Sequence, residues 1–261
     1  MSISEETHSR VKETALFLSD YASELLAVGA TSARVEMNVG RMARHFGISA
    51  DMAILSLHTI ITATDEATGH TYSVVGRARH RPISFSRNTA LSRLSWRVID
   101  ERLSLRETRR AFDDISHSPF GNPWFVLLMA GLANMSFCYL FGGDTWAMGV
   151  VFAATAIGYC AKTCLLRLGI DHRMVFLLSA FCATVVGCSC QVFGLGDTPE
   201  VAMGTSVLYL VPGIPFINSI SDLIYGHNIC FFSRLTNACV LTICLSAGFI
   251  LGLLVMGIGN V

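Results

Sequence analysis

The chain has 261 residues, of which 52% are hydrophobic and only 15% are charged, and its 19 basic and 19 acidic residues balance to a net charge of zero. An ordinary soluble domain carries about 25% charged residues, so this composition excludes a single conventional soluble domain. The charges are also unevenly placed, because 15 of the 19 basic and 14 of the 19 acidic residues precede Pro119. The sequence therefore predicts a soluble part at residues 1–118 and a membrane part at residues 119–261.

The soluble part predicts a small α+β domain. Apolar residues recur at helical spacing between residues 9 and 27, and Gly29 is expected to end this helix. The next predicted elements are a helix from Thr31 or Ser32 to His45, strands at 52–64 and 71–79 joined by a turn at 65–70, and helices at about 86–101 and 105–117. Ser104 and Glu107 have the spacing of a capping box at the start of the last helix.

Three arginines, Arg77, Arg79 and Arg81, alternate at the end of the second predicted strand and are expected to share one strand face. They could bind an anionic solute or lipid head groups. They could equally form a solvated sheet edge that discourages aggregation. The sequence leaves both interpretations open.

Five apolar stretches follow, and spanning a bilayer takes about 20 such residues. Many small residues lie in them, which favours helices packed closely in a bundle. The predicted fold is therefore an α-helical membrane protein with five transmembrane helices and a small N-terminal α+β cytoplasmic domain. The helices are expected at about 124–141, 146–161, 174–193, 201–225 (broken at 212–215) and 235–258.

The basic residues predict the orientation in the membrane, because cytoplasmic loops carry an excess of Lys and Arg. The soluble part holds 15 of them, the loop at 162–173 holds three and the loop at 226–234 holds one. All of these fall on one side, so the N-terminal domain is expected in the cytoplasm and Val261 outside, in the periplasm of a cell with an inner membrane. The polar opening residues show no signal-peptide pattern, which agrees with a cytoplasmic N-terminus.

The fourth stretch carries the residues that we expect to act in function. Pro212, Gly213 and Pro215 should break the helix, since proline removes a backbone donor and clashes with the preceding turn. Asn218, Ser221 and Asp222 follow, and Asp222 is the only acidic residue inside any of the five stretches. An ionisable group inside a membrane is a functional hypothesis by default, so these six residues are predicted to form a solute path or a proton-coupling site. Alternatively, Asp222 lies near the cytoplasmic interface and only anchors the helix end.

Common catalytic motifs are missing, including a Walker A loop, GxGxxG, HExxH and GxSxG. We therefore expect no enzyme, no cofactor and no nucleic-acid partner, and any transport would be driven by a gradient. The nine cysteines all lie between Cys138 and Cys244, mostly in apolar runs where Cys packs as a small hydrophobe. A metal or redox pair at Cys188 and Cys190 is the less favoured interpretation, and no metal site is expected.

Two segments resemble the threonine/serine exporter family. They are the run from Leu210 to Asp222, continuing to Gly226-His227, and the run from Gly29 to Glu36. The resemblance covers almost the whole chain, in the same order of soluble domain and five helices. Long family members hold ten helices in one polypeptide, so this chain resembles the N-terminal half of the split type. A second membrane subunit, and an assembly of several copies, are implied partners beside the lipid bilayer.

The resemblance implies export of a small carboxylate or amino-acid solute. The split type implies succinate, whereas the long members imply threonine or serine. A membrane-anchored sensor or scaffold, working through its soluble domain, is an alternative of a different class. A membrane enzyme acting on lipid or peptide is the least favoured alternative.

Overall fold

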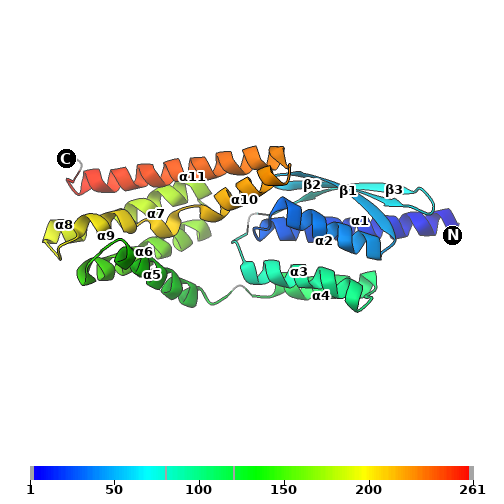
Figure 1. Ribbon diagram of the computed structural model, residues 1–261, viewed down its shortest axis with the longest axis horizontal. Helices are drawn as coiled ribbons and strands as arrows, with labels where there is room; N and C mark the ends of the chain where they lie inside the picture. The colour runs from blue at the N-terminus through cyan, green and yellow to red at the C-terminus, as the bar shows by residue number, and fades with distance from the viewer. Residues whose placement is uncertain (1–2, 80, 120, 259–261) are drawn as a thin grey trace. The chain divides into compact units, whose positions relative to one another are not determined.

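The computed structural model describes residues 3–79, 81–119 and 121–258, and the chain forms two compact units (Figure 1). The first unit contains residues 1–119 and 214–235, and the second contains residues 120–213 and 236–261. This division differs from the predicted boundary near residue 118 in one respect. Residues 214–235 are distant in sequence from the N-terminal part, yet they pack as part of its unit. The expected external end at Val261 lies outside the described residues.

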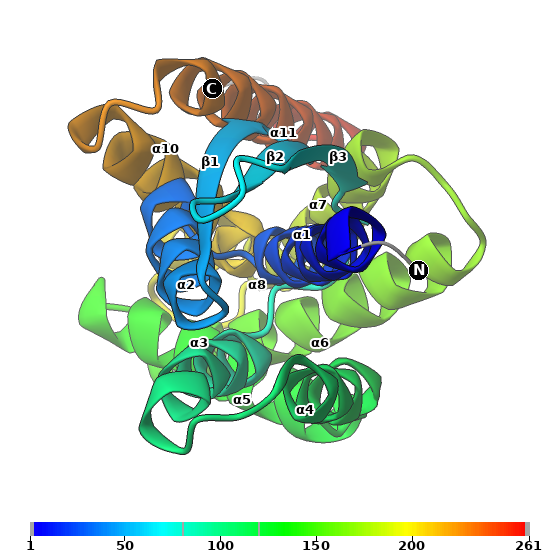
Figure 2. The same ribbon diagram turned by 90° about the vertical axis from the view of Figure 1, so that its right-hand side faces the viewer.

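The first unit has three layers, which are seen from two directions in Figures 1 and 2. Its first layer is a sheet of β1, β2 and β3, its second is α1 and α2, and its third is α3 and α4. The bounds are α1 Ile3–Ala27, α2 Ser32–His45, β1 Ile48–Leu55, β2 His58–Asp65, β3 Thr71–Arg77, α3 Phe85–Asp100 and α4 Leu105–His117. Helix α1 lies between the sheet and α4, so its apolar positions are buried on nearly every side.

The core of the first unit is centred on α1. Phe17, Leu18 and Tyr21 are fully buried, and Tyr21 satisfies its hydroxyl by donating to the carbonyl of Leu91 on α3 at 2.9 Å. Fully burying an apolar side chain stabilises a fold by about 1.5–3 kcal/mol, so this cluster is a main source of stability. Cys230, from the distant 214–235 segment, belongs to the same core and lies 3.0 Å from the carbonyl of Ile54.

The sheet is a meander with the order β1-β2-β3, and both pairs are antiparallel. The prediction of one strand at 52–64 is wrong, because the chain turns at Ser56 and pairs Leu55 with His58. Ser56 adopts a φ of 55°, a conformation for which turns usually use glycine or asparagine, so no turn signal is visible in the sequence at this position. The turn expected at 65–70 is confirmed, since β2 and β3 pair on either side of it.

Local caps fix the helix starts in this unit. Thr31 accepts the amide of Arg34 at the start of α2, and the predicted capping box of Ser104 and Glu107 is confirmed at the start of α4. The Ser104 side chain and amide hold the pKa of Glu107 below its usual value. Each cap satisfies backbone amides that a helix leaves without intrahelical partners.

Every regular element in the described part of the second unit is a helix or a 3-10 turn. It contains α5 Pro123–Leu140, α6 Thr145–Arg167, α7 His172–Gly187, α8 Ser189–Phe193, α9 Pro199–Thr205, the 3-10 turn Leu208–Leu210 and most of α11 Asn228–Val255. Side chains of Asn122, Asp144 and Asp171 cap α5, α6 and α7. Amide donors, chiefly that of Ala147, hold the pKa of Asp144 below its usual value.

Four helices among the described residues are long and apolar enough to cross a membrane: α5, α6, the α7–α8 pair and α11. A fifth span is counted if α9 with its 3-10 turn and α10, Gly213–Ile224, are taken together as one broken helix. The expected helix at 146–161 is longer than predicted, because α6 continues to Arg167 and includes Lys162. The chain is thus mostly helical with four to five candidate membrane spans and a small sheet near the N-terminus.

Candidate functional site

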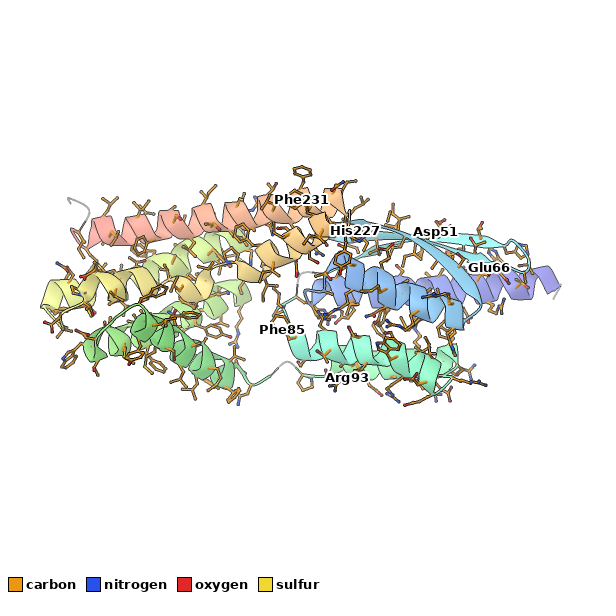
Figure 3. The ribbon with its side chains drawn as sticks, in the orientation of Figure 1. Asp51, Glu66, Phe85, Arg93, His227 and Phe231 are labelled. Atoms are coloured by element: carbon orange, nitrogen blue, oxygen red, sulfur yellow. The ribbon has the colours of Figure 1, made fainter. Side chains whose placement is uncertain are left out.

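The candidate site lies within the first unit, where a helical hairpin of α10 and the start of α11 meets the loop after α1. Gly226 makes the hairpin turn with a φ of +81°, which a residue with a side chain rarely adopts. The amide of His227 donates to the carbonyl of Asp222 at 2.8 Å, which closes the end of α10. Figure 3 labels His227 at this turn.

Asp222 is fully buried and is held by two groups. Its Oδ2 lies 2.8 Å from Nη1 of Arg234 on α11, and its Oδ1 accepts the amide of Ser32 at 3.2 Å. Ser32 is the first residue of α2, so the carboxylate also lies where the helix dipole favours negative charge. A buried carboxylate needs such partners, because an isolated buried charge is strongly unfavourable.

Arg234 joins the same network to the loop after α1. Its side chain is 15% exposed, and its Nη2 donates to the carbonyl of Ala30 at 3.3 Å. Asn218, one helical turn before Asp222, donates to the carbonyl of Gly29 at 3.0 Å. Gly29 has a φ of +91° and ends α1, which leaves these two carbonyls free to accept from α10 and α11.

We call Asp222, Arg234, Asn218 and the Gly29–Ser32 loop the latch. One further contact lies next to the latch. Nε2 of His227 is 3.3 Å from the carboxylate of Glu36 on α2, and the two side chains form an ion pair when the histidine is protonated. A pocket of about 200 Å³ lies beside this pair and is lined by residues of α2 together with Tyr225 and His227. The latch therefore joins the two segments on which the family resemblance rests, Gly29–Glu36 and the run ending at His227.

The structure brings together only two of the six residues expected at the site. Asn218 and Asp222 lie in the latch, whereas Ser221 is half-buried and its hydroxyl makes no hydrogen bond within the described part of the chain. Pro215 lies in the first turn of α10, where a missing amide leaves no intrahelical bond unmade. Pro212 and Gly213 lie at the helix break and cluster with the second unit.

Sequence reasoning did not single out three residues that make polar contacts between distant segments in the structure. Arg234 and Ser32 complete the latch, and the signal for Arg234 was its place as the only basic residue after Arg173. Asn134 is buried in the second unit, where it donates to Thr155 at 2.7 Å and to the carbonyl of Thr205 at 3.0 Å. A single amide inside an apolar helix was the available signal for it, because a polar side chain there needs partners from other helices.

The negative charge of Asp222 strengthens this arrangement. It attracts the guanidinium of Arg234 and makes the hydrogen bond from the Ser32 amide a charge-assisted one.

Comparison with known proteins gives a consistent result over most of the chain. The family model described as "Putative threonine/serine exporter" matches residues 17–256. Two curated proteins, both named "Probable succinate transporter subunit YjjP", are 28% identical to this chain over 236 residues. The relative from Klebsiella aerogenes is covered over 90% of its length and that from Escherichia coli strain K12 over 91%, in each case with 90% of this chain. No solved structure matches significantly. Because the family model covers far more than half of its residues, this chain belongs to the threonine/serine exporter family, a family of membrane transporters.

Proposed function

We propose that the chain is one subunit of a two-component exporter in the inner membrane and that its cargo is a small carboxylate, namely succinate. The observation that carries this proposal is the match over 90% of both chains to relatives named as succinate transporter subunits. A protein named as a subunit has a partner, and we infer that a second membrane protein supplies the other half of this exporter.

The orientation of the proposed subunit follows from its charges. Its N-terminal part, with 15 of the 19 basic residues, is on the cytoplasmic side, and its C-terminus is on the outer side. Large apolar residues of α5 and α11, such as Phe137, Leu251 and Leu254, are exposed within this single chain. Lipid, with or without a second subunit, would cover them.

The proposed mechanism couples proton binding at Asp222 to the helix break. With Asp222 ionised, the latch holds α10 to the Gly29–Ser32 loop through Arg234, Ser32 and Asn218. With Asp222 protonated, the ion pair is lost and α10 is held less firmly, with the hydrogen bond from Asn218 to Gly29 remaining. The helix break before Gly213 can then move and change the access of the solute path. Net export is then driven by a gradient, because the chain has no nucleotide-binding motif.

Efflux from cells that lack this protein and its presumed partner tests the proposal. Cells are loaded with labelled succinate, and then this chain alone, the pair, or the pair with Asp222→Asn is restored. We expect succinate efflux only with the pair, and its loss in Asp222→Asn. The matched control is Asp197→Asn, the same change at an exposed loop residue, which should export normally. Unchanged export and pH dependence in Asp222→Asn would refute proton coupling, and no efflux from any strain would refute succinate as the cargo.

Threonine or serine is the second candidate cargo, because the family model that matches residues 17–256 carries that description. The same strains loaded with labelled threonine distinguish the two. A sensor or scaffold function is less well supported, since such a protein needs no helix broken by two prolines next to a buried, ion-paired carboxylate. Normal efflux of both solutes after deletion of the pair would favour it.

A further inference from the structure

A second polar cleft lies in the first unit, away from the latch residues. It has a volume of about 420 Å³ and is bounded by α1, by β3 with the segment that follows it, and by α4. Pockets that hold small organic ligands measure roughly 300–1,000 Å³, so the cleft is large enough for a short solute. None of the latch residues lines it, and all of its lining residues belong to the first 119 residues.

Guanidinium groups line the β3 side of this cleft. Arg81 is committed, because it lies 2.9 Å from Glu24 in an ion pair. Arg77 and Arg79 are exposed, and over the described part of the chain neither has a carboxylate within ion-pair distance. Two uncommitted guanidiniums two residues apart can bind a carboxylate through charge-assisted, bidentate hydrogen bonds.

Hydroxyl groups gather at the inner wall, around Gly76 of β3. A β-carbon on Gly76 would lie 2.5 Å from Oγ of Ser19, 2.6 Å from Oγ of Ser23 and 2.6 Å from Oγ1 of Thr59. Ser19 is 3% exposed and Thr59 is 1% exposed. Glycine at position 76 therefore allows three hydroxyls to converge against the strand, in space that a β-carbon would need.

Several of these hydroxyls lack partners. Within the described residues, the buried oxygens of Ser23, Thr59 and Ser116 make no hydrogen bond. Ser23 and Ser116 line the cleft, and Thr59 adjoins it through Gly76. Buried polar groups are nearly always satisfied in folded proteins, so Ser23 and Ser116 would gain hydrogen bonds if their side chains rotate toward a polar occupant of the cleft.

The acidic residues of the cleft are mostly paired with arginines. Asp20 is ion-paired with Arg109, and Glu24 is ion-paired with Arg81 and Arg87. Arg77 and Arg79 therefore remain to attract an anion that is small enough to enter the cleft.

We propose that this cleft is a binding site for a small carboxylate, separate from the solute path through the membrane. The carboxylate binds Arg77 and Arg79, and a second polar group of the solute hydrogen-bonds with the hydroxyls around Gly76. A site in this position would let the N-terminal unit sense the solute. The proposal goes beyond the transport function and does not depend on it, because binding can be measured whether or not the solute is exported.

Titration calorimetry and hydrogen exchange on the purified full chain test this site. The probes are succinate and L-threonine, with succinamide and threoninol as matched solutes that lack a carboxylate. We expect at least one carboxylate probe to slow amide exchange in the peptides that cover residues 16–24 and 74–81. Binding should weaken about tenfold or more in Arg77→Gln/Arg79→Gln, because the charge-assisted hydrogen bonds from both guanidiniums to the carboxylate are lost. Arg93→Gln, on α3 and outside the cleft, is the control that should bind normally (Figure 3).

Two further variants keep the result decisive. Ser116→Leu places a larger side chain in the cleft without removing a charge, so it should also weaken binding. This variant tests the site even if the arginine variant fails to fold. Asp222→Asn should retain the exchange protection at residues 16–24, which separates failure of this site from failure of the transport mechanism. Absence of protection with both carboxylate probes, or unchanged affinity in the arginine and Ser116 variants, would overturn the proposal.

Discussion

The latch predicts a non-additive loss of stability when its ion pair is broken. In Arg234→Gln, the carboxylate of Asp222 stays fully buried but loses the cation that lies 2.8 Å away. Removing one partner of a buried pair costs about 3–5 kcal/mol. For a protein of this size, 1 kcal/mol corresponds to about 2–4 °C in Tm, so Arg234→Gln should lower the Tm of the first unit by roughly 6 °C or more.

The double variant Asp222→Asn/Arg234→Gln should recover part of this loss, because no buried charge is left without a partner. Thermal unfolding of the full chain, followed by hydrogen exchange in peptides that cover residues 214–235, reports on this unit. Arg97→Gln is the matched control, since its ion pair with Glu101 leaves both side chains about half exposed, at 52% and 49%, and it should not change the Tm measurably. Additive effects of the two latch variants, within about 0.5 kcal/mol, would refute a coupled buried pair.

Three other outcomes are expected. Hydrogen bonds, first from the amide of Ala67 and also from Arg10, hold the pKa of Asp65 below its usual value. The contribution of Asp65 to stability is therefore present above about pH 4 and is lost as the pH falls further. Asp65→Asn should reduce the fall in unfolding free energy between pH 5 and pH 2, as measured in unfolding experiments at about pH 2–5. Gly76→Ala should lower the Tm, because overpacking costs about 1–3 kcal/mol. The control Gly40→Ala on α2, where a β-carbon meets no atom within 4 Å, should raise the Tm slightly. Equal Tm shifts in the two variants would contradict the crowded hydroxyl cluster around Gly76. Ser104→Ala should increase hydrogen exchange in the first turn of α4 by removing its capping box.

The elements with strong local signals were predictable. The helix starts at Thr31 and Ser104 and the turn at residues 65–70 depend on side chains and backbone groups only a few residues apart, so the sequence expresses them directly. The apolar stretches were equally clear, because membrane-spanning length and hydropathy are local properties. The turn at Ser56 was missed because it uses neither glycine nor asparagine in its left-handed conformation.

The sequence by itself determined that the chain has a polar part and an apolar helical part, that a helix is broken beside Pro212, and that Asn218 and Asp222 share a helix face after the break. The break was expected to extend to Pro215, but it lies between Leu210 and Gly213, and Pro215 belongs to α10. The sequence could not determine what this helix face contacts. Only the tertiary structure decided that Asn218 and Asp222 bind the loop after α1, about 190 residues earlier, and that Arg234 completes the pair. The reason is physical: hydropathy and periodicity report which residues are buried, whereas the partner of a buried charge depends on which distant segments pack together.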